Sequence, residues 1–511
     1  MKTEGFGRWR SFFWPIHRAE LKKFLPMFFI FFLIAFNYNI LRSYKDSIVV
    51  TASDSGAETL PFIKLWAVLP SALLFTYLFT RLSNWYSREK LFYVVFSIFL
   101  VFFLLFAFVL YPCRSWLHPH GLANQLQQIL PIGFKGFIAI FRNWTFTLFY
   151  VMAELWSTAI FSVLFWSFAN EITSVQEARR YYGLITFGGS LAGMLSGCTA
   201  IYFSRNVYIP WLPYGDNAWD QSIFFLISAL VVSGLATMAL FRWLTVWVIS
   251  PAEKEAPPKE KIQMSMRANF AYLARSKYLL YIALIVFAYN IAMNLVEIVW
   301  KDQIRALYPD PGDYNHYMGQ VIFVMAIIAS LTGLMTTTKV IQRYSWTASA
   351  LISPVIVGIT GIIFFHFIFF PNQGMSWVLG FLHMSSPLAL SVALGSAQNC
   401  LSRASKYTFF DATKEIAFIP LSSESKLKGK AAIDGVGSRL GKSGGSVIYQ
   451  GLIILFSSVA GSIPWVAALF LAVILIWVLA VVALGKRFDQ LVPKAPKPKE
   501  PMTPAEKLTV L

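Results

Sequence analysis

Long runs of hydrophobic residues, separated by short polar stretches, dominate the chain. A helix that crosses the hydrocarbon core of a membrane needs about 20 such residues. The runs predict twelve spanning helices, at about 24–42, 60–80, 90–111, 143–168, 183–203, 222–248, 278–300, 318–338, 347–370, 376–400, 433–458 and 463–485. The fourth, tenth and eleventh run into polar sequence without a clear boundary. The pattern therefore predicts an all-α integral membrane protein.

Composition and charge distribution support this fold class. Of the 511 residues, 57% are hydrophobic and 13% are charged, whereas a soluble domain has about 25% charged residues. The net charge of +18 could suggest nucleic acid, but 34 of the 43 Lys and Arg residues lie in the termini and in alternate loops. Because basic loops stay in the cytoplasm, we expect both termini there and no nucleic acid partner. No signal peptide is recognisable at the start.

One polar segment divides the predicted helices into two equal groups. Residues 250–277 are rich in Pro, Lys and Glu, which predicts a basic cytoplasmic linker. Residues 1–249 and 278–487 would then form two six-helix bundles, and the Pro- and Lys-rich residues 488–511 a disordered cytoplasmic tail.

The two halves also repeat short motifs in the same order. Tyr-Asn-Ile occurs at 38–40 and at 289–291, and a Lys-Asp pair follows each copy within about twelve residues. FANEIT at 168–173 has a looser counterpart in FDATKEIA at 410–417, and a Gly-rich helix follows both. Parallel repeats of six helices predict a major-facilitator-like fold, with a substrate site between two bundles that rock against each other.

Several ionisable and amide side chains fall inside the predicted spans, where each is costly to bury. They are Arg42, Lys45, Lys64, Glu154, Glu297 and Lys442, together with Asn39, Asn290 and Asn294. On a helix, Asn290, Asn294 and Glu297 share one face because their spacing is i, i+4 and i+7. These side chains either form buried ion pairs that hold helices together or line a polar path.

The residue types in this set favour an anionic cargo. Lys offers a point charge to phosphate and Arg a bidentate fork, and Asn amides can pair with the edge of a purine. Glu154 and Glu297 are better suited to pair with the lysines when the site is empty, or to carry protons. The stretch GSRLGKSGG lacks the Walker spacing, so we expect no ATP hydrolysis. Its Gly, Lys and Ser could bind phosphate at a helix start or simply allow close helix packing.

Four motifs then point to a family. FNYNILRSYKDSIVVTASDSGAETLPFIKLW, AELW with LFWSFANEIT, VEIVWK, and FDATKEIAFIPLSSESKLKGKAAIDGVGSRLGKSGG resemble the signatures of the non-mitochondrial ATP/ADP translocases, the nucleotide transporter family of chlamydiae, rickettsiae and plastids. The resemblance covers most of the chain. LRSYKD stands where many members have LRDTKD, which leaves Lys45 and Asp46 in place.

The resemblance implies an antiporter with twelve spans that imports external, host-derived ATP in exchange for internal ADP, alone or with phosphate, by alternating access. The two Lys and two Glu that matter in the family fall by motif on Lys64, Glu154, Glu297 and Lys442. Proton-coupled members, and members that carry other nucleotides or NAD, share these motifs, so both alternatives stay open. We expect ATP, ADP and the lipid bilayer as partners, no cofactor or metal, and no obligate protein partner. The six histidines contain no H-x4-D pair, which argues against an acyl or phosphoryl transferase.

Overall fold

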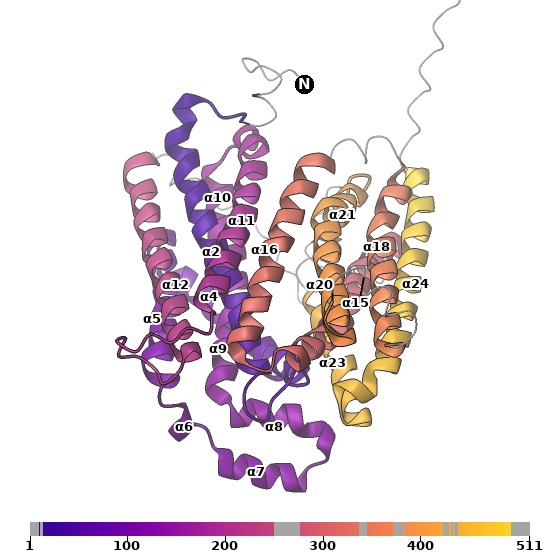
Figure 1. The fold of residues 1–511 in the computed structure, drawn as a ribbon. Coiled ribbons are helices and arrows are strands. Elements are labelled where there is room, and N and C mark those ends of the chain that lie inside the picture. The colour runs from indigo at the N-terminus through magenta and orange to yellow at the C-terminus, as the bar shows by residue number, and fades with distance from the viewer. Residues whose placement is uncertain are drawn as a thin grey trace, which may run out of the picture.

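A computed structural model describes residues 10, 14–249, 276–336, 345–371, 380, 384–422, 429–430, 433 and 438–491. These residues form helices and connecting loops, with no β-strand in the described ranges (Figure 1). The α-helices of the first half are α2 (Leu21–Val50), α3 (Thr59–Phe62), α4 (Leu69–Trp85), α5 (Arg88–Leu105), α6 (Arg114–Leu117), α7 (His120–Ile129), α8 (Lys135–Arg142), α9 (Trp144–Trp156), α10 (Trp166–Ile172), α11 (Val175–Phe203) and α12 (Ala218–Trp243). Those of the second half are α15 (Lys277–Leu307), α16 (Pro311–Thr336), α18 (Trp346–Phe369), α20 (Pro387–Ser405), α21 (Asp411–Ala417), α23 (Ser438–Phe456) and α24 (Val459–Leu491).

Short 3₁₀- and π-helices connect or extend these elements. The 3₁₀-helices are η1 (Arg18–Glu20) and η4 (Ile132–Phe134), and the π-helices are η2 (Ile63–Val68), η3 (Phe106–Leu110), η5 (Ser157–Phe165), η6 (Leu244–Val248) and η7 (Lys406–Phe410). π-helical turns are rare and occur often at functional sites. The candidate residue Lys64 lies within η2, and Glu154 lies one turn before η5.

Ten of the described helical segments are long and apolar enough to cross a membrane. They correspond to the first nine predicted spans and to the twelfth, and the chain is therefore a multi-span membrane protein. The eleventh prediction corresponds to the shorter apolar segment Ser443–Phe456. The tenth corresponds to the more polar α20, which begins at Pro387 and not near 376. A count of twelve spans stays a prediction.

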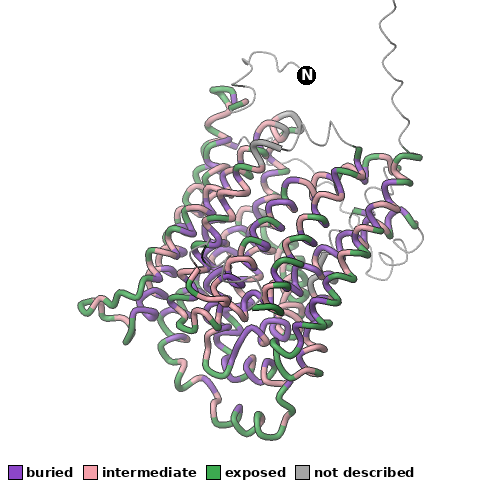
Figure 2. Tube along the Cα trace, turned by 45° about the vertical axis from the view of Figure 1, so that its right-hand side comes forward, coloured by how far each residue is buried: buried purple, intermediate pink, exposed green. Residues whose placement is uncertain are grey.

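Polar side chains mark where several of these helices begin, and exposed apolar side chains mark the faces that they turn outward. Side chains of Ser87, Asn217, Ser345 and Ser386 accept a hydrogen bond from the backbone N–H three residues on, which satisfies a donor that the first turn leaves unpaired. Exposed residues lie around the outside of the bundle (Figure 2). On η2 and α4 they include Trp66, Leu73, Leu74 and Tyr77, each more than half exposed, as expected for side chains that contact lipid.

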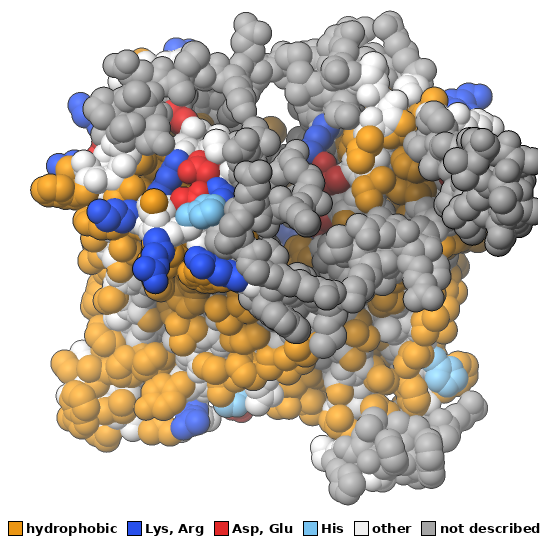
Figure 3. Space-filling model, turned by 90° about the horizontal axis from the view of Figure 1, so that it is seen from above, with side chains coloured by type: hydrophobic (Ala, Val, Ile, Leu, Met, Phe, Trp, Pro, Cys, Tyr) orange, Lys and Arg blue, Asp and Glu red, His pale blue; other side chains and the backbone are white. Residues whose placement is uncertain are grey.

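The two halves of the chain pack against each other through a few central helices. α11 packs along both α2 and α16, and α23 contacts α3, η2 and η4. The loop with α6, α7 and α8 projects beyond one end of the bundle, which we call the distal end (Figure 1). Viewed from above, charged side chains gather on part of the end face while hydrophobic ones cover much of the rest that is visible (Figure 3).

The repeated motifs adopt the same local geometry in both halves. Asn39 and Asn290, the central residues of the two Tyr-Asn-Ile copies, each donate a side-chain hydrogen bond of 2.8 Å to the carbonyl four residues earlier. FANEIT and FDATKEIA each fall on a short α-helix that directly follows a π-helix. Residues 250–275 of the predicted linker lie outside the described part of the chain. So do residues 492–511 of the predicted tail. α24 continues to Leu491, four residues past the predicted end of the second bundle.

Candidate functional site

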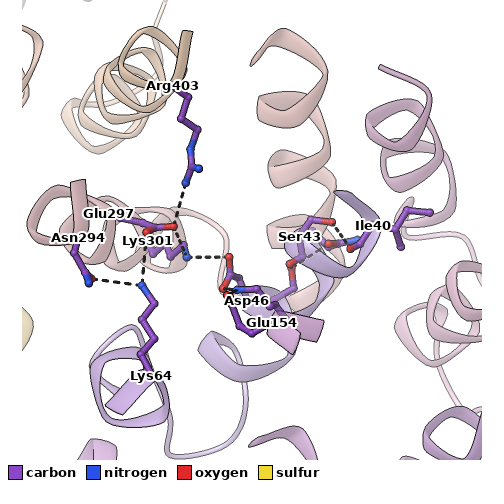
Figure 4. Close-up of polar contacts among 12 residues, drawn as sticks. Ile40, Ser43, Asp46, Lys64, Glu154, Asn294, Glu297, Lys301 and Arg403 are labelled. Carbon is purple, nitrogen blue, oxygen red and sulfur yellow. Dashed lines mark hydrogen bonds and ion pairs between the residues drawn. The ribbon is translucent and has the colours of Figure 1, made fainter. Parts of the chain in front are cut away.

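Seven charged side chains form a continuous ion-pair network where the two halves meet (Figure 4). The first half contributes four of them, from α2, η2 and α9, and the second half contributes three, from α15 and α20. They are Lys45, Asp46, Lys64 and Glu154, and Glu297, Lys301 and Arg403. Four cations face three carboxylates, so the network carries one positive charge in excess.

Lys45 links the two carboxylates that the first half of the chain contributes to the network, Asp46 and Glu154. Its ammonium group lies 2.9 Å from an Asp46 oxygen and 3.0 Å from a Glu154 oxygen. It also lies 3.9 Å from the centre of the Tyr150 ring, a cation–π contact. Lys45 is thus buried with close partners for its charge, and its contact with a substrate stays a prediction.

Lys301 bridges the two halves. Its ammonium group lies 2.8 Å from Asp46 on α2 and 2.9 Å from Glu297, one turn earlier on its own helix α15. Its side chain is 1% exposed. A buried charge is tolerated only with close partners, and Lys301 has two. Asp46 and Lys301 lie in the last two turns of α2 and α15, so this bridge joins the halves near the distal end.

Glu297 is the point where the cations converge. Besides Lys301, the Lys64 ammonium group lies 3.6 Å from one carboxylate oxygen and the Arg403 guanidinium group lies 3.6 Å from the other. Lys64 and Arg403 come from different halves and are each about one-fifth exposed. Their longer contacts and exposure distinguish them from Lys301, because another anion can approach them more easily.

Asn294 connects this centre to α23. Its side-chain oxygen accepts a hydrogen bond of 3.4 Å from Lys64, and its nitrogen donates one of 3.2 Å to Ser446. A Cβ atom added at Gly441 or Gly445 would lie 3.0 Å from the Cβ of Asn290 or Asn294. The glycines of GSRLGKSGG therefore do permit close packing of α23 on α15. Lys442 lies on α23, but its side chain is outside the described part of the chain, so its role in phosphate binding stays a prediction.

The structure separates the other candidates from the ion pairs. Asn39 and Asn290 bond to carbonyls of their own helices. Arg42 donates a long contact of 3.8 Å to the sulfur of Met325. Thus Lys45, Lys64, Glu154, Asn294 and Glu297 come together in one network, whereas the other three described candidates lie outside its hydrogen bonds and ion pairs.

Three members of the network were missing from the predicted site. Asp46 and Lys301 belong to the repeated Lys-Asp pairs, and the repetition of a buried charge pair was the signal that could have assigned them. Arg403 lies beyond the tenth predicted span, which ends at 400, whereas α20 continues to Ser405 and carries Arg403 into the interface.

A separate cavity of about 390 Å³ lies between the end of α2 and the starts of α9, α12 and α16. Its arginine, Arg114, pairs with Asp220 at 3.3 Å. Burial lowers the pKa of His118 to about 4, with smaller effects of His120 and Arg114, so this ring is neutral near pH 7. The cavity therefore lacks the cationic excess of the network. No group of three His, Cys, Asp or Glu side chains able to hold a metal ion occurs among the residues described.

Comparisons with known proteins show that the chain belongs to a family of transporters. Residues 1–488 match the family model described as TLC ATP/ADP transporter. The chain is 45% identical to "ADP,ATP carrier protein 1" of Chlamydia trachomatis over 94% of this chain and 92% of that protein. It is 41% identical to "ADP,ATP carrier protein 1, chloroplastic" of Arabidopsis thaliana over 93% of this chain and 75% of that protein. The crystal structure of a bacterial homologue of the iron transporter ferroportin in an inward-facing state is similar in fold alone, with a TM-score of 0.54, 14% identity, and coverage of 93% of this chain and 99% of that one.

Proposed function

Because this chain belongs to the TLC ATP/ADP transporter family, we propose that it is an antiporter that takes up external ATP in exchange for internal ADP, alone or together with phosphate. Transport follows the nucleotide gradients, and neither nucleotide is hydrolysed. The two halves, residues 1–249 and 278–487, alternately open the central site to each side of the membrane.

The observation that carries this proposal is the crowding of cations around Glu297. Lys64, Lys301 and Arg403 all approach this one carboxylate. A carboxylate with three cations mimics the environment that a phosphate group prefers, since phosphate accepts several charge-assisted hydrogen bonds at once. Glu297 therefore acts as an internal substitute for substrate phosphate when the site is empty.

Exchange follows from competition between the two anions. An incoming phosphate takes Lys64 and Arg403, and Glu297 then depends on Lys301, which it shares with Asp46. This competition weakens the Asp46–Lys301 bridge and allows the halves to separate near the distal end. When the nucleotide leaves, Glu297 recovers its cations and the network re-forms, so an empty carrier does not reorient readily.

The remaining candidates surround this centre and complete the substrate site. We assign Lys442 and Arg42 to phosphate, with Lys45 held by Glu154 as part of the bridge. We assign the amide groups of Asn39, Asn290 and Asn294 to the nucleoside, since an amide offers both a donor and an acceptor to the edge of a base.

The charge distribution supports an orientation with both termini in the cytoplasm. The similarity to a carrier of Chlamydia trachomatis supports a bacterial inner membrane as the location. In that orientation the projecting loop with α6, α7 and α8 is external (Figure 1). The distal ion bridge then closes the external side of the site, and the basic linker at 250–277 lies in the cytoplasm.

Proton-coupled nucleotide uptake is the second candidate function, and Glu154 favours it. This side chain is 31% exposed, more than any other member of the network, and a carboxylate near water can take up and release a proton. A member of the same family with broader nucleotide or NAD specificity would use the same phosphate-binding centre.

Reconstituted protein distinguishes these functions. We expect labelled ATP to enter liposomes loaded with ADP, and to enter empty liposomes at least tenfold more slowly. An acidic exterior should not change either rate. Uptake into empty liposomes driven by external acid would establish proton coupling instead, and a series of unlabelled nucleotides in the lumen would rank the substrates. Protein-free liposomes are the control.

A further inference from the structure

Arg403 is a member of the network whose hydrogen-bonding capacity is poorly used. Its one described ion pair is the contact of 3.6 Å with Glu297. Its Nε is buried and has no hydrogen-bond partner among the described residues. A guanidinium group has five N–H donors in a rigid fork, so most donors of Arg403 await an acceptor. The side chain is 20% exposed, which leaves the group accessible from the site.

Arg114 shows what a satisfied arginine looks like in the same protein. Its guanidinium group donates to the carbonyl of Tyr111 at 3.0 Å, pairs with Asp220 at 3.3 Å, and lies 4.0 Å from the centre of the Tyr111 ring. These contacts use both terminal nitrogens of the guanidinium group and one face of its plane. Arg403 has no comparable set of described contacts, so packing alone does not account for a guanidinium group at this position.

Arg403 also shares its anionic partner with a cation from the opposite half. Lys64 on η2 and Arg403 on α20 contact opposite oxygens of the Glu297 carboxylate, each at 3.6 Å. η2 belongs to the first half and α20 to the second. An anion that took the place of this carboxylate would therefore touch both halves of the protein.

We propose that Arg403 binds the terminal phosphate of the nucleotide together with Lys64, and that this pair makes the site select for the number of phosphates. The inference rests on the proposed function. In the structure, the two oxygens of the Glu297 carboxylate each contact one of these cations, Lys64 or Arg403. A terminal phosphate offers three oxygens and a higher charge, so it can satisfy the fork of Arg403 and the ammonium group of Lys64 at once. A nucleoside monophosphate is shorter and does not reach both cations from the same nucleoside position.

Competition for labelled ADP tests the inference. Wild-type protein should bind ADP and ATP at least tenfold more tightly than AMP. Arg403→Gln should weaken ADP and ATP binding at least tenfold while it changes AMP binding less than threefold. Arg403→Lys keeps the charge without the fork and should recover part of the loss. Arg242→Gln is the matched control, since Arg242 pairs with Glu89 at 3.3 Å outside the site and is 68% exposed.

The possible outcomes distinguish a failure of the proposed transport function from a failure of the role proposed for Arg403. Wild-type protein that ignores all three adenylates would overturn both the proposed function and this inference. Wild-type protein that binds ADP, with an Arg403→Gln variant that discriminates equally well among AMP, ADP and ATP, would overturn the inference alone. An equal loss for all three nucleotides would assign Arg403 a structural role and would also overturn it. If Arg403→Gln does not fold, Arg403→Lys decides, because an unchanged ADP-to-AMP ratio in that variant contradicts a role for the fork.

Discussion

A Lys64→Ala protein should insert into the membrane normally and lose nearly all nucleotide exchange. Removing one charge-assisted hydrogen bond to phosphate costs about 1.5–3 kcal/mol, or about 10- to 100-fold in binding. Lys64 is also one of the cations with which the first half reaches the substrate, so the bound nucleotide would link the two halves less strongly. We therefore expect exchange to fall about 100-fold or more.

The fold should tolerate this change because Lys64 is not essential for burying Glu297. Lys301 remains 2.9 Å from that carboxylate, and Arg403 remains beside it. Lys23→Ala provides a matched control, since Lys23 has a similar exposure of 14% and pairs with Glu177 at 3.3 Å near the start of α2. Wild-type exchange rates in Lys64→Ala would contradict the proposed site. Lys442→Ala, at a position assigned from the sequence, should lose exchange to a similar extent.

A Lys301→Gln protein should lose stability more than any other single variant of the network. Lys301 is almost fully buried, and it neutralises both Asp46 and Glu297. Removing one partner of a buried ion pair costs about 3–5 kcal/mol, because the remaining charge stays buried without compensation. Thermal unfolding in detergent should therefore begin at a clearly lower temperature than in the wild type.

A second substitution tests whether uncompensated charge is the cause. Asp46→Asn in the Lys301→Gln background removes one of the two carboxylates and should restore part of the stability. Lys135→Gln is the control, because Lys135 is 36% exposed and pairs with Glu58 at 3.4 Å, an arrangement worth about 1 kcal/mol or less. If Lys301→Gln unfolds at the wild-type temperature, the bridge between α2 and α15 does not hold the halves together.

The length of the hydrophobic runs predicted most of the fold, because a helix that spans a membrane must be long and apolar. The segments around α2, α5 and α24 are long and strongly apolar, and their existence followed directly. α20 and α23 carry polar and glycine residues that face other helices, so hydropathy located them less well. The end of α20 was placed too early for that reason, which removed Arg403 from consideration.

The sequence predicted several of the charged residues that belong to the candidate site, but not how they pair, and the difference has a physical cause. The energetic cost of ionisable residues within spans singled out Lys45, Lys64, Glu154 and Glu297, and the structure places all four in one network. Which cation pairs with which carboxylate depends on how the halves pack, and sequence spacing does not encode that. Asn39 and Asn290 show the same limit, because a helix can satisfy an amide side chain internally through the carbonyl one turn earlier.

The central claim is that Glu297 occupies the place of substrate phosphate between Lys64 and Arg403. ADP affinity of purified Glu297→Gln protein, measured by titration calorimetry beside wild type and a Glu89→Gln control, tests it most directly. The claim predicts that Glu297→Gln binds ADP at least several-fold more tightly than wild type, because the competing carboxylate is gone while its cations remain. Equal or weaker ADP binding by Glu297→Gln would contradict the claim.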